Sequence, residues 1–325
     1  MAVTRALALV SLTVLGSIEM TQARTRLNPV IALLEQKQPV FGLYAPANPR
    51  ARSGAPAPEA PVKTPAHLAQ DALAYVSADY IFDGSMERNF ERGYPVFAEF
   101  AKGMFDGGLL QKARLRQPLF VKTPEIAADP AKARERISQQ LNLGVSGIVF
   151  VDVKSAEEVK RGLAMMRFAS KGGTRPDAVE SAPASWGMSE REYKDKADLW
   201  PLNPNGELVN FTIVESKEGL AQVREIAAVK GIGVLFPGAG TLRGVFSTTD
   251  SAGRRVVDAI AWEVAIQQVL AACKELKVPC GYPAGEADIE MRMKQGFSVF
   301  VIGWGDPGFR AVEIGRRVGG RSATD

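Results

Sequence analysis

The chain has 325 residues, 46% of them hydrophobic, which is enough for one large α/β domain or two ordinary ones with a full core. Its 40 basic and 36 acidic residues give a formal net charge of +4 and are interspersed along the sequence. This pattern is typical of a solvated mixed surface, and it excludes a protein that binds nucleic acid through a basic and aromatic patch.

The first 23 residues differ from the rest of the chain. Arg5 precedes an apolar stretch, residues 6–15, and a polar run then ends in the small residue Ala23. This three-part pattern predicts a secretory signal peptide over residues 1–23 and a periplasmic or secreted mature protein. A frayed N-terminal helix or a wrongly assigned start is the alternative. No later stretch approaches about 18 apolar residues, so we expect no membrane span in the mature chain.

Eight short β-rich segments alternate with helical patterns. They are residues 40–45, 80–83, 118–123, 147–153, 208–215, 231–237, 279–284 and 297–304. Strands that are apolar on both faces and joined by helical crossovers predict a parallel sheet. Eight of them predict a closed (β/α)8 barrel, a TIM barrel, as a single domain over residues 24–325, with an open doubly wound sheet as the alternative.

Three of the intervening segments have clear helical signals. Residues 129–144 and 155–168 begin with Asp129 and Ser155, which are typical N-cap residues. Residues 252–277 form the longest segment. Its apolar residues near helical spacing are Val257, Ile260, Ala261, Val264 and Val269.

Two segments interrupt this alternation. Residues 46–65 are rich in proline and follow a strand, so we expect them to run extended over the carboxyl-end face of the barrel. Residues 169–206 form a long polar insert before the fifth strand. Loops of this length inside a compact domain are often functional. We therefore expect these two segments to determine substrate specificity.

The chain has two cysteines and one histidine. Cys273 and Cys280 stand seven positions apart across a predicted helix-to-strand turn. They form either a disulfide in an exported protein or a pair of small buried residues. They lack nearby histidines, so a zinc site of the usual kind is excluded. His67 lies in a predicted helix, and we interpret it as a surface or helix-packing residue.

Polar residues and glycines follow several predicted strands, where the active site of a barrel is built. They are Asp83, Glu87 and Arg88 after the second strand, Lys122 on the third, Asp152 on the fourth, Glu215 on the fifth, Gly238, Ala239 and Gly240 after the sixth, and Asp306 after the eighth. A strand-end carboxylate such as Glu215 can bind a metal, but it can equally cap a helix or pair with a lysine.

The order of these motifs resembles a known family. The segments are "GLYAPANP", "DYIFDGSMERN", "PLFVKTP", "LGVSGIVFVDVKSAEEVKRGLAMMRF", "FTIVESKEGLAQVREIAAVKGIGVLFPGAG" and "GFSVFVIGWGD". They are similar to the HpcH/HpaI aldolase and citrate lyase β-subunit family over most of residues 28–310. The resemblance implies a (β/α)8 barrel that binds Mg²⁺ or Mn²⁺ and forms or cleaves carbon–carbon bonds in 2-oxo acids or acyl-CoA thioesters. It also implies a trimer or hexamer.

The resemblance assigns roles to individual residues. Glu215 takes the position of a metal ligand, and the cation would stabilise the enolate of a 2-oxo acid. Gly238, Ala239 and Gly240 would bind the substrate carboxylate through backbone N–H groups. A tight turn that requires positive φ explains these glycines equally well. An acid after the second strand, Asp83 or Glu87, would position water or substrate.

Three positions depart from the family pattern. Gly240 stands where the second carboxylate ligand is expected, so metal binding needs a substitute acid: Asp83, Glu87 or Asp250. Lys122 replaces an arginine that binds the keto oxygen, which keeps the positive charge but loses the planar fork. Arg88 replaces a histidine. It stays charged and cannot shuttle protons, so we expect it to hold a distal acidic group of the substrate.

The leading hypothesis is a carbon–carbon lyase that acts on a small 2-oxo or hydroxy acid through a metal-stabilised enolate. Lys122 would serve as an electrophilic cation. Two alternatives stay open: a barrel that binds a small carboxylate without lyase activity, and a metal-free aldolase in which Lys122 forms a Schiff base with the substrate.

Overall fold

The computed structural model describes residues 25–49 and 61–322. The predicted signal peptide and residues 50–60 of the proline-rich segment lie outside the described residues. The described ends of that segment are tied together, because Asn48 and Lys63 exchange two hydrogen bonds of 2.8 Å.

A parallel sheet forms the centre of the molecule. All eight predicted strands are confirmed: β1 (Val40–Tyr44), β2 (Tyr80–Asp83), β5 (Leu119–Lys122), β6 (Gly147–Phe150), β8 (Leu208–Val214), β9 (Val234–Pro237), β12 (Gly281–Ala284) and β13 (Val299–Ile302). Neighbouring strands follow the order β9-β8-β6-β5-β2-β1-β13-β12, and each pair is parallel. A short strand, β7 (Leu199–Trp200), pairs with the start of β8.

The two end strands of this order, β9 and β12, also approach each other. One parallel bridge joins Leu235 to Cys280, and the N–H of Leu235 donates to the Pro279 carbonyl at 3.0 Å. The ring of Phe236 lies against Gly281, where an added Cβ would stand 2.1 Å from the ring. The architecture is therefore an α/β fold with a curved parallel sheet whose last pair of strands shares a single bridge.

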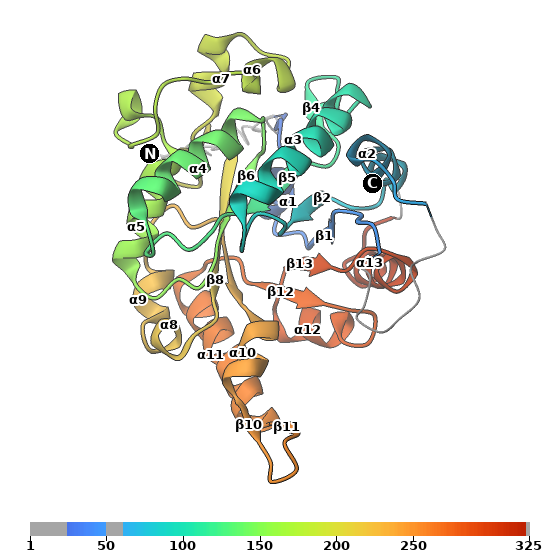
Figure 1. Ribbon diagram of the computed structural model, residues 1–325, viewed down its shortest axis with the longest axis vertical. Coiled ribbons are helices and arrows are strands. Elements are labelled where there is room, and N and C mark those ends of the chain that lie inside the picture. Colours follow the sequence, from blue (N-terminus) through green and yellow to red (C-terminus); the bar gives the residue numbers. More distant parts are fainter. Residues whose placement is uncertain (1–24, 50–60, 323–325) are drawn as a thin grey trace, which may run out of the picture.

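Helices cover the outer face of the sheet (Figure 1). They are α2 (Pro65–Ala74), α3 (Phe90–Asp106), α4 (Pro130–Asn142), α5 (Ala156–Met166), α8 (Lys217–Ala221), α9 (Val223–Ala227), α10 (Ala239–Val245), α11 (Ala259–Leu276), α12 (Ile289–Gln295) and α13 (Asp306–Val318). The predicted N-caps of α4 and α5 are confirmed, because Asp129 and Ser155 accept hydrogen bonds from the N–H groups of Lys132 and Glu158. Within residues 25–49 and 61–322, no helix combines the length and apolar character needed to cross a bilayer.

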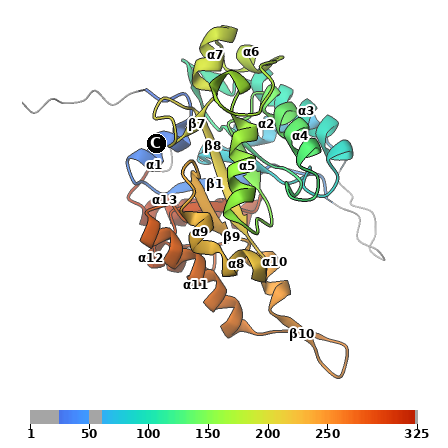
Figure 2. The same cartoon turned by 90° about the vertical axis from the view of Figure 1, so that its left-hand side faces the viewer.

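The longest helix begins later than predicted. Val257 belongs to β11 (Arg255–Val257), which forms a hairpin with β10 (Ser247–Thr249), and Asp258 caps α11 by accepting from the N–H of Ala261. The hairpin and the first turns of α11 project from the body of the molecule (Figures 1 and 2). Ile260 and Val264 are therefore 79% and 60% exposed, and the predicted apolar stripe faces the core only from Ala265 onwards.

Two apolar clusters fill the molecule, one between the sheet and the helices and one inside the curve of the sheet. The inner cluster includes three residues of α1 (Pro29–Glu35), which lies before β1. Its centre is a set of rings in mutual contact, which we call the aromatic belt: Tyr80, Phe120, Phe211 and Phe236. Glycines on adjoining strands make room for three of these rings. Gly42 faces Tyr80, Gly147 faces Phe120 and Gly281 faces Phe236.

The insert at residues 169–206 folds into short elements. They are η1 (Ala169–Lys171), α6 (Ala182–Ser185), α7 (Glu190–Lys196) and β7. Trp186 and Tyr193 are at most 1% exposed, so the insert has a packed interior. It follows a helix and precedes a strand, and therefore lies at the amino-end face of the sheet. A second short hairpin, β3 (Leu110–Gln111) with β4 (Arg114–Leu115), precedes β5.

The sequence left open whether the two cysteines form a disulfide or are separate buried residues, and the structure contains the disulfide. Cys273 on α11 and Cys280 before β12 are bonded, with Cα atoms 5.7 Å apart. The bond ties the last turn of α11 to the strand that approaches β9. His67 is exposed near the start of α2, in agreement with the surface interpretation.

Candidate active site

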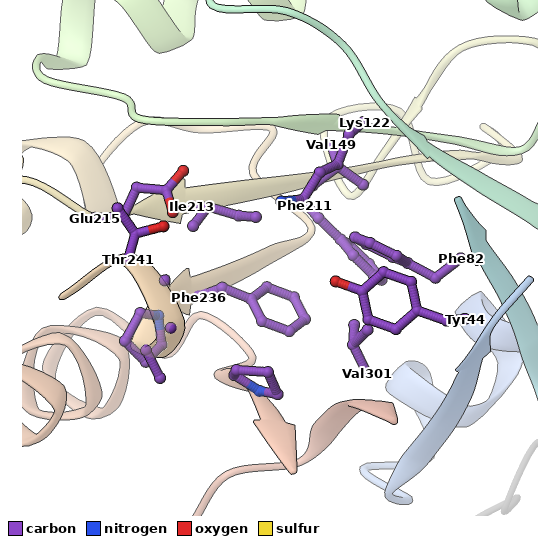
Figure 3. Close-up of a pocket in the computed structure, with 15 residues that line it drawn as sticks. Tyr44, Phe82, Lys122, Val149, Phe211, Ile213, Glu215, Phe236, Thr241 and Val301 are labelled. Carbon is purple, nitrogen blue, oxygen red and sulfur yellow. The ribbon is translucent and has the colours of Figure 1, made fainter. Parts of the chain in front are cut away.

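A pocket of about 180 Å³ opens at the carboxyl ends of the strands (Figure 3). Four polar side chains from separate parts of the chain line it: Tyr44, Lys122, Glu215 and Thr241. The other side chains are apolar: Phe82, Val149, Phe211, Ile213, Phe236, Pro237, Pro283 and Val301. The turn of Gly238, Ala239 and Gly240 completes the wall. Lys122, Glu215 and this turn, which the sequence singled out, are thus brought together.

Glu215 directly follows β8, a strand that is buried along its whole length, and the residue itself is only 6% exposed. Its Oε1 accepts the N–H of Asp152 at 3.1 Å, and the Thr241 hydroxyl donates to the same carboxylate. Burial raises the pKa of Glu215, and the bond from Thr241 and the charge of Lys122 oppose this rise. A carboxylate in such a place is suited to accept and release a proton, or to face a bound cation.

The glycine at position 238 is required by its close contact with Glu215. Gly238 has a φ of −73°, so a positive φ does not explain this glycine. A Cβ on Gly238 would instead lie 2.5 Å from Oε2 of Glu215, and only glycine admits that approach. The N–H of Gly238 donates to the Val214 carbonyl at 2.9 Å, which leaves the N–H groups of Ala239 and Gly240 as the anion-binding candidates.

Lys122 is held at the opposite wall of the pocket by an ion pair. Its Nζ lies 2.9 Å from Oε2 of Glu87, and the two side chains are 13% and 29% exposed. The backbone at Lys122 is also fixed, because Gln140 donates to its carbonyl at 2.9 Å. The lysine and its carboxylate together place a fixed cation beside the cavity.

Three further candidates lie away from the cavity. Asp83 accepts from the N–H and hydroxyl of Ser85 at 2.9 and 2.6 Å and so closes the turn after β2, while burial raises the pKa of its carboxyl. Arg88 stands just before the N-cap of α3, is exposed, and forms no ion pair with the described part of the chain. Asp306 is exposed at the start of α13.

The residues present do not make the two-carboxylate metal site of the family pattern. A Cβ added at Gly240 would meet nothing within 4 Å, so the position of the expected acid is open space. The possible substitutes are engaged elsewhere: Glu87 with Lys122, Asp83 with Ser85, and Asp250 with Arg254 in the projecting hairpin. In residues 25–49 and 61–322 no group of three or more His, Cys, Asp or Glu side chains could hold a metal ion. Glu215 alone, facing Lys122, is a poor ligand set for a hard cation.

Two residues of the pocket were not identified from the sequence. Tyr44 ends β1, and its hydroxyl points into the pocket from the side opposite Glu215 (Figure 3). Burial raises the pKa of Tyr44. Thr241 follows Gly240 directly and donates to Glu215. Tyr44 is the last residue of β1, and Thr241 lies in the first turn of α10, which follows β9. These positions were the sequence signals that could have identified them.

Comparison with known proteins identifies the family. The HpcH/HpaI aldolase/citrate lyase family matches residues 112–300, which is more than half of the chain and includes Lys122, Glu215 and the glycine turn. The chain belongs to the HpcH/HpaI aldolase/citrate lyase family. A hydroxypyruvate/pyruvate aldolase from Paraburkholderia phytofirmans is 23% identical over 218 residues, which cover 66% of this chain and 69% of that protein.

Solved structures of the HpcH/HpaI family have the same fold. A family protein from Burkholderia cenocepacia J2315 aligns with a TM-score of 0.64 and 21% identity, over 85% of this chain and 92% of that one. CitE from Mycobacterium tuberculosis, solved in a complex with magnesium, acetoacetate and coenzyme A, aligns with a TM-score of 0.50 and 13% identity, over 88% of this chain and 82% of its own. Family membership and the aldolase relative together indicate an enzyme of the carbon–carbon lyase class.

Proposed function

We propose that this HpcH/HpaI protein cleaves a small 4-hydroxy-2-oxo acid into a 2-oxo acid, such as pyruvate, and an aldehyde. The main support for the proposal is that Lys122 and Glu215 line opposite sides of one small pocket at the strand ends. The relative named as a hydroxypyruvate/pyruvate aldolase supports this substrate class. The reaction needs a cation near an enolate oxygen and a group that moves a proton, and the pocket offers one of each.

The proposed step balances without an oxidant or reductant. The bond between C3 and C4 breaks, and its electron pair passes into the enolate of the 2-oxo acid. The C4 hydroxyl loses its proton and becomes the aldehyde carbonyl, and C3 then takes up a proton. We assign the stabilisation of the enolate oxygen to the Lys122 ammonium and the proton transfers to Glu215. The N–H groups of Ala239 and Gly240 would bind the substrate carboxylate.

A bound divalent cation is an alternative means of stabilising the enolate in this proposal. The family resemblance implies Mg²⁺ or Mn²⁺, and the CitE complex contains magnesium. Here Glu215 would be the single protein carboxylate on the ion, with water and substrate oxygens as the remaining ligands. Because Gly240 supplies no second carboxylate, we assign the steps above to the side chains of this chain and none to a metal.

The ion pair between Lys122 and Glu87 bears on the Schiff-base alternative. The Nζ of Lys122 is engaged with the Glu87 carboxylate, whereas a Schiff base requires this nitrogen to attack the keto carbon of the substrate. The 2.9 Å pair therefore supports the role of a fixed cation. Borohydride reduction in the presence of pyruvate decides between the two, because only a Schiff base, formed with loss of water, is reduced to a stable secondary amine that leaves the pyruvate carbons on Lys122.

We also propose that the curved sheet closes as a complete (β/α)8 barrel. The bridge between Leu235 and Cys280 supports closure between β9 and β12. The packing of Phe236 against Gly281 supports it as well, since this contact fills the space between the same two strands.

The test of the function is a cleavage assay. The protein is incubated with a panel of 4-hydroxy-2-oxo acids, and release of the 2-oxo acid is followed with a coupled dehydrogenase, for the wild type, Lys122→Met and Glu215→Gln. We expect turnover by the wild type and a loss on the order of 100-fold in each variant. If calorimetry detects binding of oxalate while no acid of the panel is cleaved, the protein is a carboxylate-binding barrel without lyase activity.

A further inference from the structure

The pocket is polar on the side of Glu215 and Thr241. Its opposite wall is apolar except for Lys122 and the Tyr44 hydroxyl, and we call this wall the apolar end. Figure 3 places Glu215 and Thr241 on one side and Tyr44 with Phe82 on the other. Lys122 is the only cationic side chain among the pocket residues. Every other side chain that lines the pocket, apart from the Tyr44 hydroxyl, is aliphatic or aromatic.

The polar groups are all used by the reacting half of a 4-hydroxy-2-oxo acid. Its carboxylate, keto oxygen and C4 hydroxyl require the glycine turn, Lys122 and Glu215 in the mechanism proposed above. Nothing cationic then remains for a second carboxylate at the far end of the substrate. Arg88, which the sequence suggested for that purpose, is exposed and does not line the pocket.

The apolar end is built from side chains that are themselves almost fully buried. Phe82, Val149 and Val301 are 2%, 0% and 5% exposed, and Phe211 of the aromatic belt forms part of the floor. Placing an unpaired carboxylate against such walls is strongly unfavourable, whereas a hydrocarbon group gains from leaving water. The cavity of about 180 Å³ also limits the buried part of the ligand to a small molecule.

We infer that the substrate carries an apolar alkyl or aryl group on C4, and that the protein discriminates against substrates that end in a second carboxylate. This inference rests on the proposed function and narrows its substrate class. Tyr44 is the specificity-determining residue at the apolar end. Its ring packs edge-on against Phe82 with centroids 4.9 Å apart, and apart from Lys122, which the keto oxygen uses, its hydroxyl is the polar side-chain group of that wall.

The first experiment compares matched substrates. The kcat/KM for release of pyruvate is measured with 4-hydroxy-2-oxo acids that have methyl, propyl and phenyl groups on C4, and with one whose C4 chain ends in a carboxylate. We expect kcat/KM to rise about fourfold for each buried methylene and to fall on the order of 100-fold for the carboxylate-ended acid. Equal or better cleavage of the carboxylate-ended acid would overturn the inference while leaving the lyase function intact.

A matched pair of variants tests the role of Tyr44. Tyr44 is 38% exposed, so a lysine at this position can keep its ammonium group near solvent. Tyr44→Lys is expected to raise kcat/KM for the carboxylate-ended acid at least tenfold relative to the propyl acid. Tyr44→Phe is expected to keep the wild-type preference. An unchanged preference in Tyr44→Lys, with a normal thermal melt, would contradict the assignment of Tyr44.

A binding measurement separates this inference from the proposed function. Calorimetry compares 2-oxohexanoate with 2-oxohexanedioate, which have the same chain length and differ in the terminal group. Tighter binding of 2-oxohexanoate supports the apolar end whether or not cleavage occurs. Tighter binding of the dioate overturns it. Lack of cleavage with preserved selectivity for 2-oxohexanoate would remove the lyase function and leave the ligand class standing.

Discussion

Glu215 is a carboxylate held where its charged form is disfavoured. Burial is the largest cause of its raised pKa, and the hydrogen bond from Thr241 and the charge of Lys122 compensate only in part. A group whose folded-state pKa lies above the unfolded value near 4.5 adds stability at low pH, and that stability is lost as the pH rises through the folded pKa. The ionised carboxylate therefore lowers stability at neutral and higher pH.

The variant Glu215→Gln tests whether the ionised carboxylate lowers the stability of the protein. We expect its melting temperature to exceed that of the wild type at pH 8, and the gain to vanish at pH 4, where Glu215 is protonated in both the folded and unfolded chain. Thermal unfolding followed by circular dichroism at the two pH values measures the difference. A lower melting temperature than the wild type at pH 8 would mean that the charged carboxylate is well satisfied in the pocket.

Gly240 offers a test of the missing metal ligand. An added Cβ meets nothing within 4 Å, so aspartate fits there without displacing a neighbour. We expect Gly240→Asp to bind Mn²⁺ at least tenfold more tightly than the wild type in calorimetry with oxalate present, because the wall of the pocket then supplies a second carboxylate besides Glu215.

Two controls make the Mn²⁺ result specific. Gly240→Asn has nearly the same shape without the charge, and it should bind no better than the wild type. Gly240→Asp combined with Glu215→Gln should lose the gain. If the wild type already binds Mn²⁺ tightly and Glu215→Gln abolishes that binding, another ligand completes the site and the metal-stabilised enolate is the better mechanism.

At the level of secondary-structure elements, the packing inside the curve of the sheet depends on pairing a glycine with an aromatic ring. Gly42 is opposite Tyr80 in the register of β1 and β2, and a Cβ on Gly42 would stand 2.1 Å from the Tyr80 ring. The belt also forms part of the pocket floor through Phe211 and Phe236, so its packing positions the site.

The variant Gly42→Ala is expected to destabilise the protein by about 1–3 kcal/mol, the usual cost of overpacking a core. Chemical denaturation measures the free energy of unfolding. Gly285→Ala is the matched control, because the nearest atom to its added Cβ is 4.0 Å away, and its effect should be within about 0.5 kcal/mol. Equal effects of the two substitutions would show that the belt is not closely packed.

The strands were predictable from the sequence because each is a short, mostly apolar run rich in β-forming residues. The start of α11 was not, since Val257, Ile260 and Val264 keep helical spacing although the first lies in a hairpin and the others are exposed. The sequence analysis also did not recognise that the insert at residues 169–206 lies at the amino-end face of the sheet. None of its residues lines the pocket, which contradicts the expectation that the insert determines substrate specificity.

The candidate site could be predicted only as far as backbone position allows. The end of a strand fixes the position of a residue's backbone, and this was enough to identify Lys122 and Glu215. It does not fix where the side chain points. Asp83 turns back to Ser85, and Arg88 faces solvent in the turn before α3. Tyr44 was overlooked because a tyrosine at a strand end is as compatible with packing as with a site.

At the scale of the whole molecule, the projecting arm formed by β10, β11 and the first turns of α11 exposes apolar side chains. Val256, Ile260 and Val264 are 49%, 79% and 60% exposed. Side chains of this kind gathered in one place mark an association surface. They support the proposal, first implied by the family resemblance, that the protein assembles as a trimer or hexamer.

Light scattering at micromolar concentration tests this assembly. We expect an oligomer for the wild type and a monomer for the double variant Ile260→Glu with Val264→Glu, with little change in the thermal melt of the fold. Met291→Glu, at a residue on α12 that is 44% exposed, is the control and should leave the mass unchanged. A monomeric wild type would contradict the proposal.

Export stays a prediction based on the N-terminal residues. The disulfide between Cys273 and Cys280 supports it, because such bonds persist in oxidising compartments and are rare in the cytosol.

Exchange of the pyruvate methyl protons in D₂O shows whether the pocket forms the enolate of a 2-oxo acid with Lys122 and Glu215. Proton NMR follows the methyl signal without the need to know which aldehyde the natural substrate releases. We expect the wild type to exchange these protons and both Lys122→Met and Glu215→Gln to be slower on the order of 100-fold. Pyruvate that binds to the wild type but keeps its methyl protons would show that the pocket does not form the enolate.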